Sequence, residues 1–276
     1  MIIIKTASGL NVAEKWEREK AYTVAKGKNG KNCVLLNSVI DNVLHVAEGN
    51  SKTGNAINFN LPIEFTCDHR CECYKSALCY AEGGCYTFSS NQAGYSENLN
   101  FYRNTDSETF IQALQLALNT LRYSLFRYFT CGDIPDQRFF DCMVTLARNN
   151  QHVKFWSYTK KYNIVNAWID NNGPLPENLI IIFSHWMNAD GTYFPMDNKH
   201  SLPTSEFIPF GREELKEHVT HICPCSDPTV NVTCATCDHP CYTLKPGESM
   251  ALLEHSTSKT KQRDKEIKTA KANLKK

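Results

Sequence analysis

Short apolar runs and segments of helical spacing alternate between residues 125 and 184 of this chain. The runs at 125–130, 152–159 and 178–184 are predicted strands, and the stretches at 136–150 and 162–172 are predicted helices between them. Strands that look buried and that alternate with helices are typical of a parallel sheet with right-handed crossovers. The sequence therefore predicts an α/β protein with a parallel sheet or a partial (βα) barrel.

The flanking segments add further predicted elements. Residues 33–66 look rich in β-strand, including an alternating run at 57–65, and helical spacing follows at 91–104 and 107–122. Residues 219–223 read as one more strand. The long polar stretch at 187–218, which is rich in Pro and Gly, is interpreted as an excursion from the core.

Polar and titratable residues follow the predicted strands at the point where each strand ends. Ligand sites of parallel α/β sheets gather at the carboxyl ends of the strands. Asp133, Lys160 and His185 occupy such positions and are the candidate catalytic residues, with Asp133 and Lys160 also candidates for holding a cofactor. Strand ends are often polar simply because the chain leaves the core there, and this alternative applies to each of the three residues.

Ten of the thirteen cysteines lie in two short stretches, residues 66–86 and 221–244, here called the first and second cysteine segments. The N-terminus offers no apolar run of signal-peptide or membrane-spanning length, so a cytoplasmic location without a membrane partner is expected. In a reducing compartment, clustered cysteines are more often metal ligands or catalytic thiols than disulfides. Both segments are therefore predicted to be metal-binding loops.

Spacing suggests two sets of four thiolate ligands. The first cysteine segment reads C-x3-C-x-C-x5-C, which differs from the C-x3-C-x2-C of radical S-adenosylmethionine enzymes by offering a fourth cysteine. The second contains C-x2-C-x3-C, a spacing that suits one face of an iron–sulfur cubane better than a single zinc ion. Two 4Fe-4S clusters are predicted, with zinc as the alternative. The predicted ligands are Cys67, Cys71, Cys73 and Cys79 in the first set, and Cys223, Cys234, Cys237 and Cys241 in the second.

The other cysteines are assigned no ligand role. Cys33 and Cys142 are interpreted as buried thiols, because Cys142 lies among the apolar residues of its predicted helix. Cys85, Cys131 and Cys225 are left between the two interpretations.

The charge of the chain is unevenly distributed. The formal net charge is +1, yet residues 256–276 carry seven Lys and one Arg against one Asp and one Glu, a local charge of +6. We treat residues 1–255 as one α/β domain and 256–276 as a basic tail. A basic tail can bind a phosphate backbone, so residues 257–276 are a candidate nucleic-acid contact, although such tails are more often solvated chain ends.

Several phrases, in this order and spacing, resemble the gene product 88 family of bacteriophages and phage-derived bacterial elements. They are LPIEFTC and CYA in the first cysteine segment, FRYFTCGDI, FWSYTKKYNIVN, LPENLIIIFSHW, and the C-x2-C-x3-C ending that runs into YTLKPGES. The resemblance covers roughly residues 50–255. It implies one ligand set of Cys67, one cysteine of the Cys71 and Cys73 pair, and Cys79, and a second set identical to the one above. It also implies a Gly-Asp at Gly132 and Asp133 and a distant similarity to the radical S-adenosylmethionine partial barrel.

Three functions are compatible with these features. The leading one is a phage-type iron–sulfur protein in electron transfer, redox sensing or cluster-supported binding, with an unidentified redox or protein partner. The second is a radical S-adenosylmethionine-like enzyme with an auxiliary cluster, which would need an open iron in the first cysteine segment. The third is a zinc-stabilised nucleic-acid-binding protein that stacks bases on Trp156, Tyr158 and Trp186.

Overall fold

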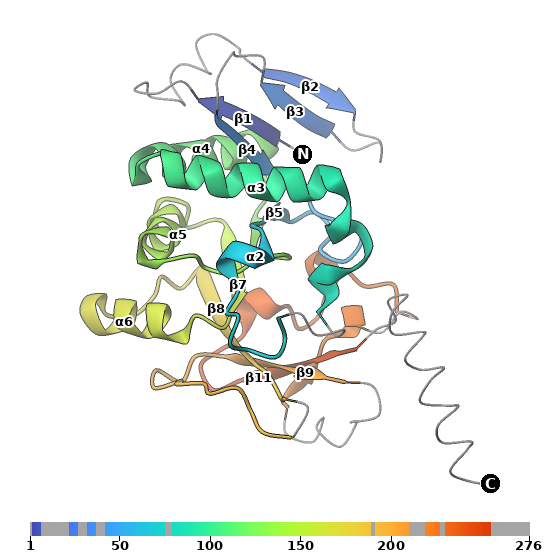
Figure 1. Ribbon diagram of the computed structural model, residues 1–276, viewed down its shortest axis with the longest axis vertical. Coiled ribbons are helices and arrows are strands. Elements are labelled where there is room, and N and C mark those ends of the chain that lie inside the picture. The colour runs from blue at the N-terminus through green and yellow to red at the C-terminus, as the bar shows by residue number, and fades with distance from the viewer. Residues whose placement is uncertain are drawn as a thin grey trace, which may run out of the picture.

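The computed structural model describes residues 2–6, 22–26, 32–36, 42–74, 79–188, 191–209, 219–226 and 230–254, with side chains from residue 44 onward (Figure 1). The basic tail and the side chain of Cys33 lie outside this part. The interpretations made for them therefore remain predictions.

Seven strands form one open sheet in which every neighbouring pair is parallel. The spatial order is β10-β11-β9-β8-β7-β6-β5, so five successive strands are added in one direction. This arrangement confirms the α/β prediction. The strands are β5 (Ile57–Phe59), β6 (Leu125–Tyr128), β7 (Lys154–Thr159), β8 (Leu179–His185), β9 (Thr204–Ile208), β10 (His221–Ile222) and β11 (Ser249–Leu253).

Four longer helices connect the first strands and pack along one side of the sheet (Figure 1). Right-handed crossovers between strands added in one direction place all their helices on the same face. Asp106 and Asp136 cap the helices that follow them, accepting bonds from the backbone N–H groups of Thr109 and Phe139 at 2.7 and 2.9 Å. The helices are α3 (Ser89–Asn104), α4 (Ser107–Leu121), α5 (Gln137–Asn149) and α6 (Tyr162–Asn172), with a short α2 (Ile63–Thr66) after β5.

Aromatic side chains fill the space between these helices and the sheet. Phe139 of α5 is fully buried, and its ring centroid lies 5.0 Å from that of Tyr102, 5.3 Å from that of Phe110 and 6.0 Å from that of Phe59. Aromatic rings at these separations add to the free energy gained from burial alone. The helix-covered face of the sheet therefore carries the main core.

The second cysteine segment covers the opposite face of the sheet. Trp156 of β7, Ile182 of β8 and Met250 of β11 are buried there against Cys223 and Cys241. The cysteine segments form short 3-10 turns instead of longer helices. These turns are η1 (Tyr80–Glu82), η2 (Gly84–Thr87), η4 (Pro224–Ser226), η5 (Cys234–Thr236) and η6 (Cys241–Thr243).

A second sheet of four strands precedes the parallel sheet, in the order β2-β3-β1-β4. Its last strand meets α3, where Asn98 donates to the carbonyl oxygens of His45 and Asn60, each at 2.9 Å. The β-rich character predicted near the N-terminus is thus present. The strands are β1 (Ile2–Thr6), β2 (Tyr22–Lys26), β3 (Asn32–Leu36) and β4 (Asn42–Val46).

Two sequence interpretations were wrong. The stretch at 187–218 is not only an excursion, because β9 lies within it and pairs with β8 and β11. The predicted strand at 57–65 ends at Phe59, since Pro62 has no N–H for a sheet and α2 begins directly after it. β11 lies beyond the predicted elements altogether.

Candidate functional site

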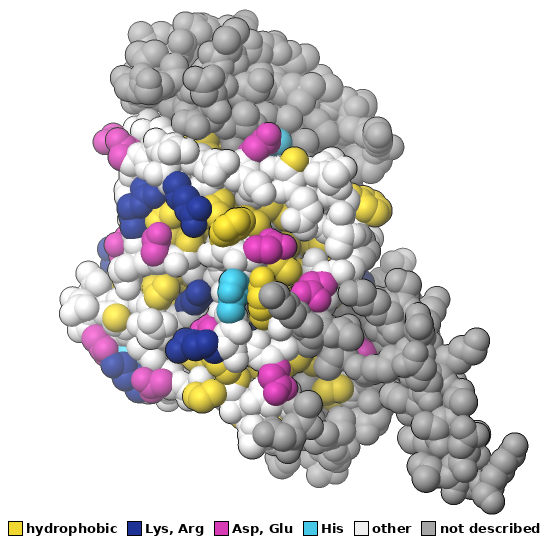
Figure 2. Space-filling view, viewed as in Figure 1, with side chains coloured by type: hydrophobic (Ala, Val, Ile, Leu, Met, Phe, Trp, Pro, Cys, Tyr) yellow, Lys and Arg dark blue, Asp and Glu magenta, His cyan; other side chains and the backbone are white. Residues whose placement is uncertain are grey.

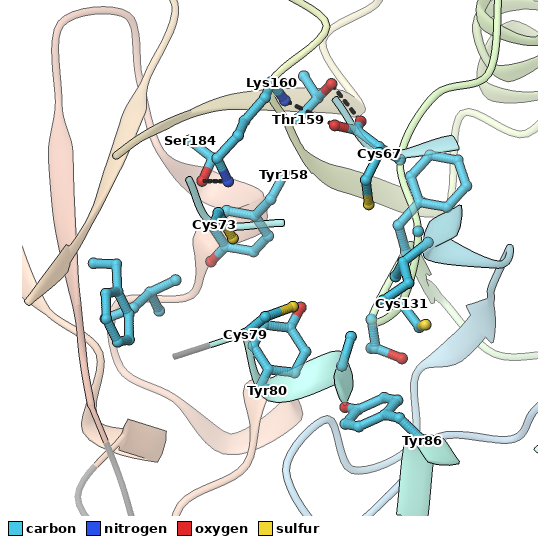
Figure 3. Close-up of a pocket in the computed structure, with 18 of the residues that line it drawn as sticks. Cys67, Cys73, Cys79, Tyr80, Tyr86, Cys131, Tyr158, Thr159, Lys160 and Ser184 are labelled. Carbon is cyan, nitrogen blue, oxygen red and sulfur yellow. Dashed lines mark hydrogen bonds between the residues drawn. The ribbon is translucent and has the colours of Figure 1, made fainter. Parts of the chain in front are cut away.

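One cavity of about 260 Å³ lies between the two cysteine segments and the carboxyl ends of β6, β7 and β8 (Figure 3). Its size is near the lower end of the range of roughly 300–1000 Å³ found for small-molecule sites. Every cysteine of the first cysteine segment except Cys85 lines it, and so does every cysteine of the second except Cys237. The fold thus brings two distant cysteine-rich stretches to the walls of one cavity.

The loop after β6 is held in a fixed shape beside this cavity. The side chain of Asn60 accepts bonds from the backbone N–H groups of Thr130 and Cys131 at 2.8 and 3.1 Å. Gly132 has a φ of +91°, and a Cβ on it would lie 2.5 Å from the carbonyl oxygen of Leu61. Glycine is therefore required at this position.

Asp133 lies at the end of this loop and is largely buried. One carboxylate oxygen accepts from the Thr159 hydroxyl at 2.6 Å and from the Ile134 N–H at 2.7 Å, and the other accepts from the Lys160 N–H at 3.0 Å. Burial raises the pKa of this carboxyl above its usual value, although these hydrogen bonds act to lower it. Through these bonds Asp133 links the loop after β6 to the end of β7.

Lys160 reaches into the cavity, as Figure 3 shows, and its Nζ lies 3.1 Å from the hydroxyl oxygen of Ser184. Burial acts to lower the pKa of its ammonium group, but the nearby Cys73, Cys71 and Asp133 raise it more, so the net shift is upward. Lys160 is therefore a cation placed beside the thiols of the first cysteine segment.

The thiols of the first cysteine segment have shifted pKa values. Burial raises the pKa of Cys67, and raises that of Cys71 to about 11. Cys73 and Cys79 share a hydrogen bond that favours the thiolate of Cys73 and raises the pKa of Cys79. Lys160 lowers the pKa of Cys71 and Cys73, so its charge partly offsets the cost of burying thiolates.

The second cysteine segment packs its thiols against polar groups of the sheet. The Tyr158 hydroxyl donates to the Cys241 sulfur at 2.8 Å, and Cys225 Sγ lies 3.3 Å from the carbonyl oxygen of Val232. Burial raises the pKa of both thiols to about 12. Negative charge on Cys223 or Cys234 would raise the pKa of Cys225 and of Cys241 further. The sulfur atoms of the second cysteine segment therefore lie close enough to interact.

All twelve cysteines with described side chains are free thiols. Within the described residues, no group of three or more Cys, His, Asp or Glu side chains converges closely enough to hold a single metal ion. The predicted ligands thus surround a cavity and do not converge on one point.

His185 departs from the prediction and Cys142 agrees with it. His185 does not line the cavity, because side chains alternate along β8 and Ser184 takes the position that faces Lys160. Its ring stacks on that of Tyr193 with centroids 4.0 Å apart, and burial lowers its pKa while Glu206 acts to raise it. Cys142 is buried in the helix-covered core, as predicted.

Arg127 is a cavity residue that the sequence interpretation missed. It lies in the middle of β6, between Phe126 and Tyr128, which both face the helices. A charged residue inside an apolar strand of a parallel sheet is unusual, because such strands are covered on both faces. The charge of Arg127 between two aromatic residues was the sequence signal that could have identified it as a site residue.

The nucleic-acid contact predicted for residues 257–276 lies outside the described residues, and the described surface adds no second sign of it. On the face shown in Figure 2, basic and acidic side chains are interspersed and no continuous basic band crosses it. Trp156 and Trp186 are buried, so neither offers a ring for stacking bases. No helix among the described residues combines the length and apolar character needed to cross a bilayer.

Comparison with protein-family models places residues 35–201 in the family described as Gene product 88. The match covers more than half of the chain, so the protein belongs to this phage gene product family. It begins at residue 35 instead of 50 and ends at residue 201 instead of 255, which leaves the second cysteine segment outside it. Comparisons with curated proteins and with solved structures found no match.

Proposed function

We propose that this member of the Gene product 88 family is an iron–sulfur protein with two 4Fe-4S clusters, one for each cysteine segment. The clusters would supply reversible one-electron chemistry for electron transfer, redox sensing or cluster-supported binding. The proposed ligands are Cys67, Cys71, Cys73 and Cys79 for one cluster, and Cys223, Cys234, Cys237 and Cys241 for the other.

The observation that carries the proposal is the convergence of both cysteine segments on one cavity as free thiols. Thiols placed by chance would be scattered through the core, as Cys142 is. Soft thiolate sulfur is the ligand that iron–sulfur clusters and zinc prefer. Of the proposed ligands, only Cys237 does not line the cavity, and its thiol lies near enough to Cys223 for the latter's charge to raise its pKa.

The spacing of the ligands favours clusters over zinc. A zinc ion needs its sulfur ligands about 2.3 Å from one point. A cubane binds each cysteine to a different iron, so the C-x2-C-x3-C spacing of the second cysteine segment suits one of its faces.

Charge compensation also supports the proposal. Buried thiolates are costly unless cations lie nearby. Lys160 lies beside Cys71 and Cys73, and the Arg127 guanidinium acts to lower the pKa of Cys234 and Cys241. Each cysteine segment therefore has one buried cation beside it.

The test is anaerobic purification followed by an ultraviolet–visible spectrum with iron, sulfide and zinc counts on the same sample. Two cubane clusters predict a brown protein with about eight irons and eight sulfides per chain. Cys73→Ser and Cys241→Ser should each remove about four irons, whereas Cys142→Ser should remove none. A colourless protein with zinc and no sulfide would contradict the proposal.

Ligand counting separates a closed cluster from the enzyme alternative, in which one iron of the first cluster binds S-adenosylmethionine. The position of Lys160 beside the first cysteine segment and the cavity is the observation that favours this alternative. A closed cluster requires all four cysteines of the first set. If Cys67, Cys71 and Cys79 suffice for a full iron count when Cys73 is replaced, the open-cluster alternative is favoured.

A further inference from the structure

Arg127 carries a positive charge that no carboxylate in the described structure pairs with. Its side chain lines the cavity, and its Nε is shielded from solvent without a hydrogen-bond partner. Within the described residues no ion pair joins it to a carboxylate. A buried donor without a partner is costly and in native proteins usually indicates a missing ligand, ion or water.

The carboxyl groups that line the same cavity are engaged elsewhere or are not paired with Arg127. Asp133 uses both oxygens to join β6 and β7, and Asp68 forms an ion pair with Arg70. Glu254 also lines the cavity. The second cavity cation, Lys160, has the neutral Ser184 hydroxyl as its side-chain hydrogen-bond partner. Arg127 is thus a cavity cation without a described ion pair, and it favours an anionic occupant.

Aromatic rings surround the guanidinium group. Its central carbon lies 5.2 Å from the centroid of the Tyr158 ring, and Tyr80 and Tyr86 are near enough to influence its charge. The rings of Tyr80 and Tyr86 meet edge to face, with centroids 5.5 Å apart. Such walls suit a planar or apolar body, and the planar fork of arginine suits a carboxylate or phosphate.

We propose that this cavity binds a small molecule with an oxyanion, either a carboxylate or a phosphate, and a planar apolar body, with Arg127 holding the oxyanion. The tyrosines would contact the body of the ligand. The proposal goes beyond iron–sulfur binding, because it concerns the part of the cavity beside Arg127 and the tyrosines and not the thiols.

Thermal shift and isothermal titration with benzoate, phenyl phosphate and benzamide test the proposal on the full-length protein. At least one of the two anions should raise Tm and bind, while neutral benzamide, which has nearly the same shape as benzoate, should not. The stronger of the two identifies the carboxylate or the phosphate as the preferred group. Iron and sulfide are counted on every sample.

Arg127→Met removes the charge and keeps the approximate length of the side chain. We expect it to weaken binding of the preferred anion about tenfold or more. It should also raise the Tm of the ligand-free protein by about 2–4 °C, because an uncompensated buried charge is removed. Arg127→Lys should retain part of the affinity. The matched control Arg148→Met, on the exposed side of α5, should leave binding unchanged.

Three results would overturn the proposal. One is equal binding of benzamide and the anions, and another is the absence of any response of the wild type to either anion. The third is unchanged anion binding in Arg127→Met together with a loss of iron, which would assign Arg127 to the metal site. A wild type without iron that still binds an anion through Arg127 would sustain this inference while the proposed function fails.

Discussion

The two faces of the parallel sheet are built from different kinds of residue. On the helix-covered face, strand residues such as Phe126, Phe155 and Ile181 pack into an aromatic and aliphatic core. On the opposite face, the same strands present Arg127 and Tyr158 to a cavity walled by thiols. Because side chains alternate along each strand, one set of strands supplies both. The same short strands therefore supply the core on one face and the candidate site on the other.

The accessibility of the thiols gives the largest contrast between the two faces. In a protein that carries the proposed clusters, labelling of the described thiols should be fast only at the exposed Cys85. Removing the metal with a chelator should speed labelling of the partly exposed Cys67, Cys79 and Cys234 by about tenfold or more, because metal-bound thiolates are released. Cys142 should stay protected throughout. Mass spectrometry of labelled peptides measures this, and identical labelling before and after chelation would contradict it.

Large-to-small substitution should have its greatest effect on the helix-covered face. Phe139→Ala removes a ring that contacts Phe59, Tyr102 and Phe110, and should lower the free energy of unfolding by about 3–5 kcal/mol. Urea denaturation of the metal-free protein measures the change. A loss below about 1 kcal/mol would show that this core is not what stabilises the fold.

Tyr128 and the partly buried Tyr158 allow the same hydroxyl to be deleted on each face. Tyr158→Phe removes donation to Cys241 and to the Met250 sulfur, at 2.8 and 3.2 Å, and should cost about 1 kcal/mol. Tyr128→Phe deletes a hydroxyl that is buried without a partner and should be neutral or stabilising. Urea denaturation of both variants gives the difference. The opposite order would refute the assignment of polar contacts to the cavity face.

The smallest expected effect is a pH dependence at His185. Burial lowers its pKa in the folded state, so between the usual value near 6.5 and that lower value the unfolded chain binds more protons. Stability present above about pH 6.5 should therefore be lost as the pH falls through this window. His185→Phe should reduce the loss by a few tenths of a kcal/mol. Burial also lowers the pKa of His45, so His45 should account for part of the loss that is left in this variant. A pH series of urea midpoints measures the slope, and an unchanged slope would exclude His185 as its source.

Local signals were sufficient for the helices and for the central strands. The predicted helix at 162–172 matches α6 as it stands, because Gly173 ends it with a positive φ. β9 and β11 could not be predicted from local sequence signals. Each has five residues, and each is a strand through pairing with neighbours distant in the sequence, which local periodicity does not encode.

Strand alternation could have located more of the site than it did. In β8, Phe183 belongs to the helix-covered core, so His185 shares that side and Ser184 must face the cavity. The same counting in β6 assigns Arg127 to the cavity face. What the sequence could not supply is the meeting of the two cysteine segments, which lie more than 130 residues apart and depend on the strand order.

The position of β11 affects the order in which the molecule can be completed during synthesis. β11 is the last described strand along the chain, yet it lies between β9 and β10 and pairs with both. The turns that carry Cys223 to Cys241 join β10 to β11, so this wall cannot close until residues 249–253 have left the ribosome. By then every cysteine has been made. Until then the thiols of this wall would be open to any source of the proposed clusters, and insertion of one short strand would end that interval.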